Sequence, residues 1–518
     1  MLAQASVLKM SSQSSLPSFS LQAKVFATCW LIFVLHFATD IVREHYLSFS
    51  LAEDYSFRTD KYLGLHVDIV NTPGYGAHID NNPGVSMVGA IPFWLARPAI
   101  DRIVASINAK RVSSTDKPVY NDPRPRRVEF YSKAYQRGLD IQFGLAAFVI
   151  QALFMAPLSA LSAVIILKTL SRVALSVEMS LFGAFLYALG TPIFFRTAYL
   201  NQNLFIAHLL LFGFVALWRP GGSPKWRNAT TCAAVGFMGG LALLSDYSGG
   251  IVLAWLGAYA AWKAWESDGW ASVRRSSLAY AAGAAGPIAL LLFYQWRAFG
   301  SPWYPGQHYM PPVEWIEVGY KGVGGPEWRL FQMLLFDSRF GLFVACPVLA
   351  LALVGFVQAF RRSAWLPRAE ALFLGGFSLA FVVFFSAIQY TQLQWVTGIR
   401  YLVPVIPSLF LLAFVFLAKL PRPILYPIAV LAFAQSWCMS MVRATEIQDS
   451  VARVLLGGFQ LPWMNVLAKM APQYLTFLGP GQQLSPLPLF VMCAALLYGI
   501  WRYPDTGSAK RLDPRSAE

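Results

Sequence analysis

The sequence has little charge and few cysteines. Of its 518 residues, only 13% are Asp, Glu, Lys or Arg, compared with roughly 25% in a typical soluble domain. The five cysteines each lie in an apolar run and form no Cys-x-x-Cys pair, so we expect small buried side chains there. With 56% hydrophobic residues and a mean hydropathy of +0.49, this composition excludes a soluble globular protein, a disordered chain, a collagen and a disulfide scaffold.

Several functional motifs are also missing from the sequence. It contains no Walker A sequence, no Gly-x-Gly-x-x-Gly and no Gly-x-Ser-x-Gly, so nothing indicates a nucleotide-binding loop or a hydrolase nucleophile elbow. The net charge of +15 would suggest nucleic acid in a soluble protein. Here we expect basic cytoplasmic loops and contacts with membrane lipid instead, and no nucleic-acid partner.

What the sequence does contain is a series of long apolar stretches, separated by short polar breaks. Their length predicts membrane-spanning helices rather than barrel strands. The expected fold class is an all-α polytopic membrane protein with about twelve spans. The spans are predicted near 23–40, 139–167, 176–195, 198–217, 229–245, 248–265, 277–296, 341–358, 370–388, 400–418, 423–441 and 487–501.

One further apolar run, 84–99, decides the orientation. It is short for a span, and Pro92 interrupts it. If it does not cross, the basic breaks between the spans share one side with the N-terminus and the tail, as the positive-inside rule requires. We therefore expect 84–99 to be a juxtamembrane or re-entrant helix on the outer face, and both termini to be cytoplasmic.

This orientation gives the predicted division of the chain. A cytoplasmic leader covers 1–22, and a transmembrane catalytic module covers 23–441. An outer loop with the last helix follows at 442–501, and a basic cytoplasmic tail at 502–518. The outer segments are about 40–138, 297–340 and 442–485, with a large first outer loop. Segment 102–137 is basic although it lies outside, which long loops tolerate.

Ionisable residues at the outer helix ends are the first candidates for chemistry, since charges near a membrane are costly. Asp40, Glu44 and His45 follow the first span. They form either an interfacial cluster whose side chains reach toward water or a site with a carboxylate acting as general base. Asp246 and Tyr247 lie in a tight turn between two spans, where the Asp either caps the turn or serves the site.

Cations and histidines leave similar alternatives open. Arg339 and Arg400 each precede a span on the outer side, and Arg196 has the same ambiguity. Arginine binds phosphate with two hydrogen bonds, but it also anchors to lipid headgroups. His308 follows an outer Phe-Gly-Ser-Pro sequence and is either a loop or a site residue. His208 lies inside an apolar span, where packing is the simpler interpretation.

Five segments together resemble bacterial polytopic glycosyltransferases of the GT-C superfamily, which includes protein O-mannosyltransferases and aminoarabinose transferases. They occur in the expected order and cover most of the chain. The segments are NNPGVSMVGAIPFWL at 81–95, LALLSDYSGGIVL at 241–253, AFGSPWYPGQHY at 298–309, LLFDSRFGLFVACPVLALALVGF at 334–356 and WVTGIRYLVPVIPSLFLL at 395–412.

The resemblance implies a GT-C-like bundle that transfers sugar from a polyprenyl-phosphate donor at the periplasmic face of the bacterial inner membrane. The acceptor would be a lipid-linked glycan, a lipid or a protein. Asp40 is implied as the catalytic base, with Glu44 as the alternative. No cofactor is certain, and a divalent cation stays open. The implied substrate-binding residues are His45, Asp80, Asn82, Asp246, Tyr247, His308, Arg339, Arg400 and Tyr401.

The sequence departs from the family pattern before Pro83. Related segments often carry Lys there, whereas this chain has Asp80, Asn81 and Asn82. Another cation must then hold the donor phosphate, or the donor differs, or activity is lost. Two other functions therefore stay open, a transporter or flippase for lipid-linked sugars and a non-catalytic scaffold. A transporter should carry its ionisable residues near mid-membrane, whereas here they gather at outer helix ends.

Overall fold

The computed structural model describes residues 18–112, 125–173, 175–221, 229–312, 314–361, 364–393, 398–443, 446–470 and 484–502. Most of the predicted leader, the basic tail after residue 502 and Trp395 of the fifth segment lie outside the described residues. Within them the chain is almost entirely helical, and its one sheet is a two-stranded hairpin. This confirms the predicted all-α fold class.

The first half of the chain carries the hairpin and the helices that surround it. Its elements are α1 (Phe19–Leu35), α2 (Arg43–Asp54), β1 (Ile69–Thr72), β2 (Gly76–Ile79), α3 (Gly84–Val112), α4 (Pro125–Gln136), α5 (Asp140–Ile150), a π-helical turn (Gln151–Met155), α6 (Ala156–Arg172), α7 (Val177–Leu189), α8 (Ile193–Arg196), α9 (Gln202–Trp218) and α10 (Ala229–Ser245).

The second half continues the helical bundle. Its elements are α11 (Gly249–Phe299), α12 (Trp328–Phe336), α13 (Leu342–Ala345), α14 (Ala352–Ala359), α15 (Arg368–Ser386), α16 (Ile406–Leu417), α17 (Arg422–Met441), α18 (Ile447–Gly457), α19 (Pro462–Met470) and α20 (Leu487–Arg502). Short 3-10 turns lie at Asp60–Tyr62, Gly306–Tyr309, Glu314–Ile316, Pro347–Leu351, Gln389–Gln392 and Val403–Val405.

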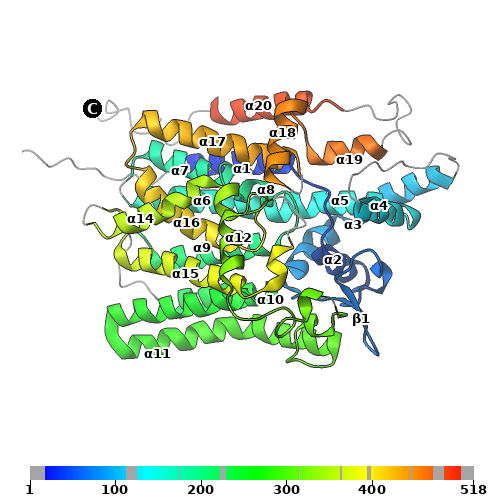
Figure 1. Cartoon of the computed structure of the whole chain (residues 1–518), viewed down its shortest axis with the longest axis horizontal. Coiled ribbons are helices and arrows are strands. Elements are labelled where there is room, and N and C mark those ends of the chain that lie inside the picture. The colour runs from blue at the N-terminus through cyan, green and yellow to red at the C-terminus, as the bar shows by residue number, and fades with distance from the viewer. Residues whose placement is uncertain are drawn as a thin grey trace, which may run out of the picture.

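The apolar helices coincide with the predicted spans. Among the described residues, four are long and apolar enough to cross a membrane, and seven shorter apolar helices accompany them. The longest, α11, breaks its helical backbone at Asp268 and Gly269 and folds back on itself (Figure 1). Its two legs therefore account for the two spans predicted at 248–265 and 277–296.

Glycines let α10 and α11 pack closely. A Cβ at Gly249 would lie 2.1 Å from the carbonyl oxygen of Ala242, and one at Gly236 would lie 2.0 Å from that of Tyr280. Small residues bring helix backbones together inside membranes, where no hydrophobic effect drives association. The tight turn between α10 and α11 therefore follows from sequence, and it holds Asp246 at the helix ends.

The run at 84–99 differs from the prediction in one respect. It begins α3, a helix of 29 residues that continues through both Pro92 and Pro98. The predicted interruption at Pro92 is therefore wrong. Packing against α2, α5 and α10 stabilises α3 and offsets the hydrogen bond lost at each proline. It is not among the four helices suited to crossing.

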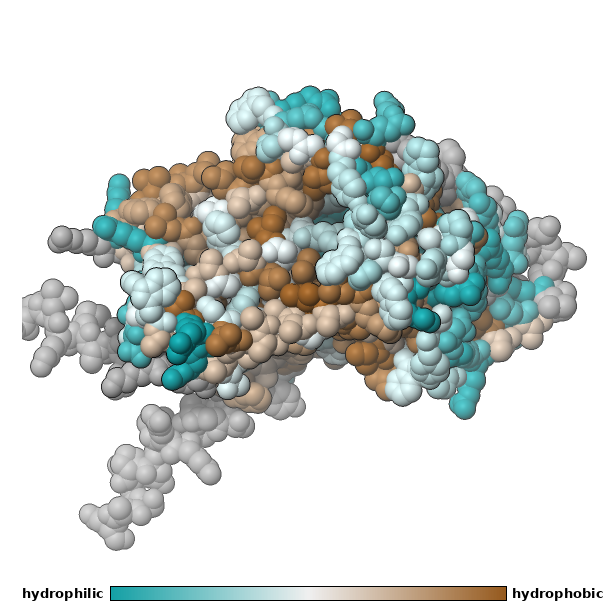
Figure 2. All heavy atoms as spheres, turned by 90° about the horizontal axis from the view of Figure 1, so that it is seen from below, coloured by the Kyte–Doolittle hydropathy of each residue, from teal (hydrophilic) through white to brown (hydrophobic). Residues whose placement is uncertain are grey.

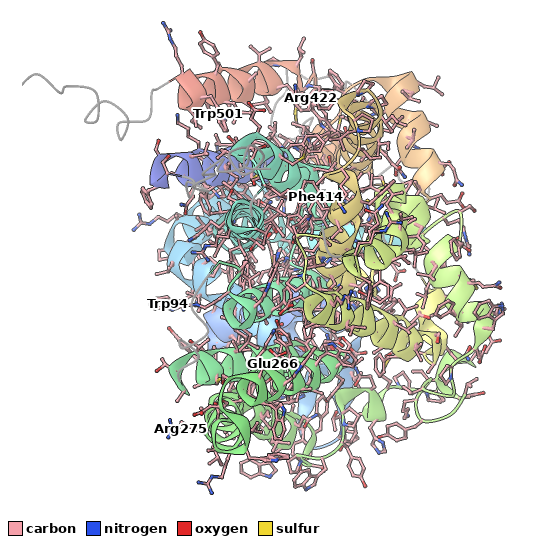
Figure 3. All side chains as sticks on the ribbon, turned by 90° about the vertical axis from the view of Figure 1, so that its left-hand side faces the viewer. Trp94, Glu266, Arg275, Phe414, Arg422 and Trp501 are labelled. Carbon is pink, nitrogen blue, oxygen red and sulfur yellow. The ribbon has the colours of Figure 1, made fainter. Side chains whose placement is uncertain are left out.

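The two ends of the bundle differ in composition. The bend of α11, the connection from α14 to α15 and the start of α17 lie at one end, while α2, β1 and the loop after α11 lie at the other (Figure 1). Figure 3 views the first end, with Glu266, Arg275 and Arg422 labelled. Hydrophobic residues cover much of the helical body, and hydrophilic residues gather toward the second end (Figure 2).

Candidate active site

Three carboxylates surround one arginine at the end that carries α2. Arg43 Nη1 lies 3.0 Å from Asp80 Oδ1 and 3.2 Å from Asp68 Oδ2, and Arg43 Nε lies 3.1 Å from Glu44 Oε1. The arginine and Glu44 begin α2, whereas the two aspartates flank the β1–β2 hairpin. The hairpin pairs Ile69 with Ile79, so residues 68 and 80 lie side by side. We call Arg43, Glu44, Asp68 and Asp80 the acidic cluster.

The acidic cluster holds more negative charge than its one arginine neutralises. Burial raises the pKa of Asp80 to about 8, and the charges of Asp68 and Glu44 add to this effect while Arg43 opposes it. For Glu44, burial acts in the same direction, but the nearby guanidinium groups of Arg43 and Arg400 outweigh it and lower its pKa. One proton therefore resides on the cluster near neutral pH, and Asp80 carries it.

A chain of amides joins the cluster to the α10–α11 turn. Asn81 Nδ2 donates to Glu44 Oε1 over 3.2 Å and also donates to the side-chain oxygen of Gln202. Gln202 Nε2 in turn donates to Asp246 Oδ2 over 2.8 Å, while Asp246 Oδ1 accepts from the backbone N–H of Ser248. Asp246 thus caps its turn and also connects through Gln202 to the acidic cluster; its role in a site stays a prediction.

Close backbone contacts bring three of the motif segments together. A Cβ at Gly84 would lie 2.5 Å from Ser245 Oγ, and one at Gly306 would lie 2.6 Å from the carbonyl oxygen of Asp80. Asn82 Nδ2 donates to the carbonyl of Leu243 over 2.7 Å. The segments at 81–95, 241–253 and 298–309 therefore meet around the acidic cluster.

A second group of charges surrounds Tyr199. Arg196, fully buried, donates from Nη1 to the Tyr199 hydroxyl over 2.7 Å and from Nη2 to the carbonyl of Gly398 over 2.9 Å. The guanidinium of Arg443 lies 4.6 Å from the centre of the Tyr199 ring. Arg400 interacts electrostatically with Tyr199, and it lies in electrostatic range of Arg196 and of Glu44. We call Arg196, Arg400 and Arg443 the arginine group.

Asp40 lies beside the arginine group. Its Oδ2 accepts from Arg443 Nε over 2.8 Å, and its Oδ1 accepts from Arg127 Nη2 over 3.1 Å. Its side chain is 16% exposed, compared with 5% for Glu44. Two predicted carboxylates are thus separated, with Asp40 among arginines and Glu44 within the acidic cluster. Which of them is the base stays a prediction.

Other predicted residues take several positions. His45 is buried and its Nδ1 accepts the backbone N–H of Val42. Burial lowers the pKa of His45 to about 4, so its ring is neutral and caps α2. Tyr247 accepts a hydrogen bond from Gln295 Nε2. Tyr401 packs against Tyr390 and beneath the guanidinium of Arg400.

Three residues singled out from the sequence have other described contacts. Arg339, with 49% of its side chain exposed, pairs with Asp337 in its own loop. Among the described contacts none joins Arg339 to the acidic cluster or the arginine group, whereas Arg400 interacts electrostatically with Glu44 and Arg196. His208 lies inside the bundle, 3.0 Å from Ser159 Oγ, which fits the packing interpretation. His308 lies in the loop after α11 and stacks on Tyr304.

Sequence reasoning missed several members of the network. Gln202 and Tyr199 belong to the short polar run YLNQN at 199–203 between apolar stretches, a signal that could have drawn attention to them. Arg443 follows the span ending near 441 in the same way that Arg196 follows its own span. Nothing in the local sequence singles out Tyr390.

The cluster does not resemble a metal site. Among the described residues, no three His, Cys, Asp or Glu side chains are arranged to hold a metal ion. The three carboxylates closest to one another instead point to Arg43. The described residues therefore provide no ligand set for a divalent cation.

The fold and the charged end together describe a multi-pass membrane protein with an arginine-rich polar site. No protein-family model and no curated protein matches the chain. Its fold is similar to the crystal structure of ArnT from Cupriavidus metallidurans bound to undecaprenyl phosphate, with 15% identity, a TM-score of 0.48 and coverage of 93% of this chain and 75% of that one. It is also similar to the S. cerevisiae protein O-mannosyltransferase Pmt1-Pmt2 complex bound to the sugar donor, with 17% identity, a TM-score of 0.32 and coverage of 54% and 33%.

The two structures share only 15% and 17% identity with this chain and have TM-scores of only 0.48 and 0.32. A function is therefore inferred from the motif segments and from the geometry of the charged end.

Proposed function

We propose that the chain is a membrane glycosyltransferase that transfers a sugar from a polyprenyl-phosphate carrier to an acceptor at the outer, periplasmic face of the inner membrane. The observation that carries this proposal is the meeting of the acidic cluster and the arginine group at one end of the bundle. Segments from four separate parts of the chain assemble that end. Both termini would lie on the cytoplasmic side.

The arginine group would bind the donor phosphate. Arg400 lies in electrostatic range of both charged groups, since it interacts with Glu44 and with Arg196. Guanidinium groups suit phosphate because they offer several N–H donors in one plane. Arg43 already faces three carboxylates, so Arg400 takes the role of the lysine that is missing before Pro83. The polyprenyl tail would extend along the apolar helices.

Asp40 would act as the general base. In the proposed reaction it accepts the proton of the acceptor hydroxyl, whose oxygen attacks the anomeric carbon of the sugar. The bond between that carbon and the phosphate oxygen breaks, and its electron pair stays on the phosphate. Positive charge on Arg400 and its neighbours stabilises the negative charge that develops there. Arg127 and Arg443 hold the Asp40 carboxylate in place.

The acidic cluster would position the sugar. Together with Asn81, Gln202 and Asp246 it forms one hydrogen-bonded network, beside which Asn82 lies, and carboxylates and amides bind sugar hydroxyls well. Asp80 carries a proton near neutral pH and so can both donate and accept a hydrogen bond. The acceptor would be a lipid-linked glycan, a lipid or a protein.

The proposal is tested with the full chain in lipid nanodiscs and polyprenyl-phosphate hexoses labelled in the sugar, with membrane extract as the source of acceptor. If the chain transfers sugar, label should appear in the acceptor at the same rate as free polyprenyl phosphate is released. Neither product should form without acceptor. In proteoliposomes, movement of intact donor across the bilayer without cleavage would indicate a flippase instead. If the chain neither cleaves nor binds the donor, only the interpretation as a non-catalytic scaffold is left.

A further inference from the structure

Aromatic rings stack on the surface of the loop that follows α11. Tyr304 and His308 have ring centres 4.7 Å apart and planes inclined by 16°, and His308 and Tyr320 have centres 6.2 Å apart and planes inclined by 25°. The Tyr320 hydroxyl lies 3.2 Å from His308 Nδ1. Tyr304 and Tyr320 are 51% and 54% exposed, and the adjacent Trp303 is 77% exposed. We call these four residues the aromatic shelf.

The backbone holds the shelf in place. Tyr320 and Val323 close a tight turn, in which Gly319 has a positive φ of 61° and a Cβ there would meet the carbonyl oxygen of Val323 at 2.1 Å. Gly324 N–H donates to the carbonyl of Ala387 over 2.8 Å, which fixes the turn to the segment before Tyr390. The turn that carries Tyr320 is therefore ordered before any ligand arrives, which lowers the entropic cost of binding there.

The shelf adjoins the acidic cluster. Gly306, between Tyr304 and His308 in sequence, packs directly on the backbone of Asp80. Tyr320 lies in electrostatic range of Tyr247, the residue after Asp246. A ligand bound on the shelf would thus extend toward the network in which the proposed transfer takes place.

We infer that the aromatic shelf binds the sugar rings of the acceptor, and that the acceptor is therefore a glycan rather than a bare lipid or a protein. This inference rests on the proposed function of the neighbouring charged groups. Aromatic faces carry partial negative charge, and the C–H groups on one face of a pyranose carry partial positive charge. The two faces therefore attract each other when a sugar ring stacks on an aromatic ring. The edges of the same rings offer hydroxyl and imidazole groups to the sugar hydroxyls.

Charged neighbours favour a glycan over membrane lipid as the ligand. Exposed Glu314 and Glu317 lie on the same loop, and Lys321 follows Tyr320. Carboxylates beside the rings oppose both burial in hydrocarbon and contact with anionic headgroups. They do not oppose a neutral sugar chain in water.

Binding is measured by calorimetry on the full chain in nanodiscs, without donor, using maltohexaose, cellohexaose and chitohexaose as probes. We expect at least one probe to bind, and Tyr304→Ala and Tyr320→Ala to weaken that binding by about tenfold or more. Tyr304→Phe keeps the ring face and should bind nearly as well as the natural protein. Trp270→Ala is the matched control, because Trp270 is 74% exposed at the bend of α11.

Three results would overturn the inference. The first is that none of the three probes binds. The second is that the alanine variants bind as tightly as Trp270→Ala. The third is that brominated lipids quench the part of the emission that Trp303→Phe removes, since this would place the shelf in the membrane interface. Because no donor is present, probe binding without sugar transfer would contradict only the proposed function, and transfer without probe binding would contradict only the shelf.

Discussion

Arg43 Nη1 and Asp80 Oδ1 lie 3.0 Å apart, and this contact joins the start of α2 to the segment before α3. The GT-C sequences that this segment resembles often carry lysine there. In this chain the carboxyl group of Asp80 stands there, and the guanidinium group that faces it comes from α2. Because Glu44 and Asp68 also face Arg43, this arginine is committed to protein carboxylates, and in the proposed function the donor phosphate would bind the arginine group instead.

The proton on Asp80 predicts a pH dependence of stability. In the folded chain Asp80 keeps its proton up to about pH 8, whereas its ordinary value is 3.8. The folded state therefore binds more protons between these values, so its stability should decrease as pH rises and become constant above about 8. Between pH 6.5 and 8 we expect a slope of about 1 kcal/mol per pH unit from this group.

Thermal unfolding of the detergent-solubilised chain at several pH values in that range measures the slope. Buried histidines such as His45, whose pKa is lowered in the folded chain, take up protons in the unfolded chain below about pH 7.5 and so add a slope of opposite sign. The natural chain and the variants share this histidine contribution, so Asp80→Asn should differ from the natural chain by the Asp80 contribution of about 1 kcal/mol per pH unit, whereas Asp101→Asn, at an exposed position on α3, should keep the natural slope. Equal slopes for the natural chain and Asp80→Asn would show that Asp80 ionises normally.

The contact between two motif segments depends on Gly84. Its added Cβ would lie 2.5 Å from Ser245 Oγ and 2.8 Å from backbone of Leu244, so Gly84→Ala should destabilise the chain by about 1–3 kcal/mol. Gly144 in α5 has no atom within 4 Å of its added Cβ, and Gly144→Ala should leave stability unchanged or raise it slightly. Denaturation of both variants in detergent measures the difference, which would vanish if the segments did not touch.

Gln202 links two buried groups. Replacing it with Leu would leave Asn81 and Asp246 each without one hydrogen-bond partner, which should cost about 1–3 kcal/mol for each unsatisfied group. Asn465→Ala removes an exposed amide pair with Gln460 and should change the unfolding free energy by less than about 0.5 kcal/mol. Equal free energies of unfolding for Gln202→Leu and Asn465→Ala would show that water replaces the missing hydrogen bonds, which would contradict a closed network at Gln202.

Substitutions of the two candidate phosphate-binding arginines should have different effects on the affinity for the donor lipid. Arg400→Gln should weaken binding of polyprenyl phosphate by about 10- to 100-fold, as expected for the loss of one charge-assisted contact to phosphate. Arg339→Gln should have an effect of less than about threefold, because Arg339 pairs with Asp337 at the surface. Titration of the phosphate lipid in nanodiscs measures both. The opposite order would place the phosphate beside the fourth segment.

The sequence was sufficient to predict the helices but not how the charged groups meet. Apolar length predicts each span because the membrane leaves helices as the main solution for a spanning chain. The acidic cluster was harder, since Asp68 and Asp80 are brought together by the pairing of Ile69 with Ile79, which their spacing alone does not specify. Contacts such as Arg443 with Asp40 join residues about 400 positions apart, which no local pattern records.

The predicted interruption of α3 was wrong for a related reason. Local propensity counts the hydrogen bond that Pro92 removes, but it does not count the packing of α3 on α2 and α5. Contacts between residues far apart in the sequence determine both the acidic cluster and the continuity of α3. Asn82, Asp246 and Arg400 come from three separate motif segments, and each makes a contact or an electrostatic interaction at the charged end; their part in a site stays a prediction.

The most direct test of the central claim compares Asp40→Asn with Asp101→Asn and Glu44→Gln in the sugar-transfer assay. Loss of a general base should lower the transfer rate by about 10²- to 10⁴-fold, with donor binding retained. The account predicts this loss for Asp40→Asn, a rate close to that of the natural chain for Asp101→Asn, and a smaller loss for Glu44→Gln. Full transfer by Asp40→Asn, or none by the natural chain with any acceptor, would contradict it.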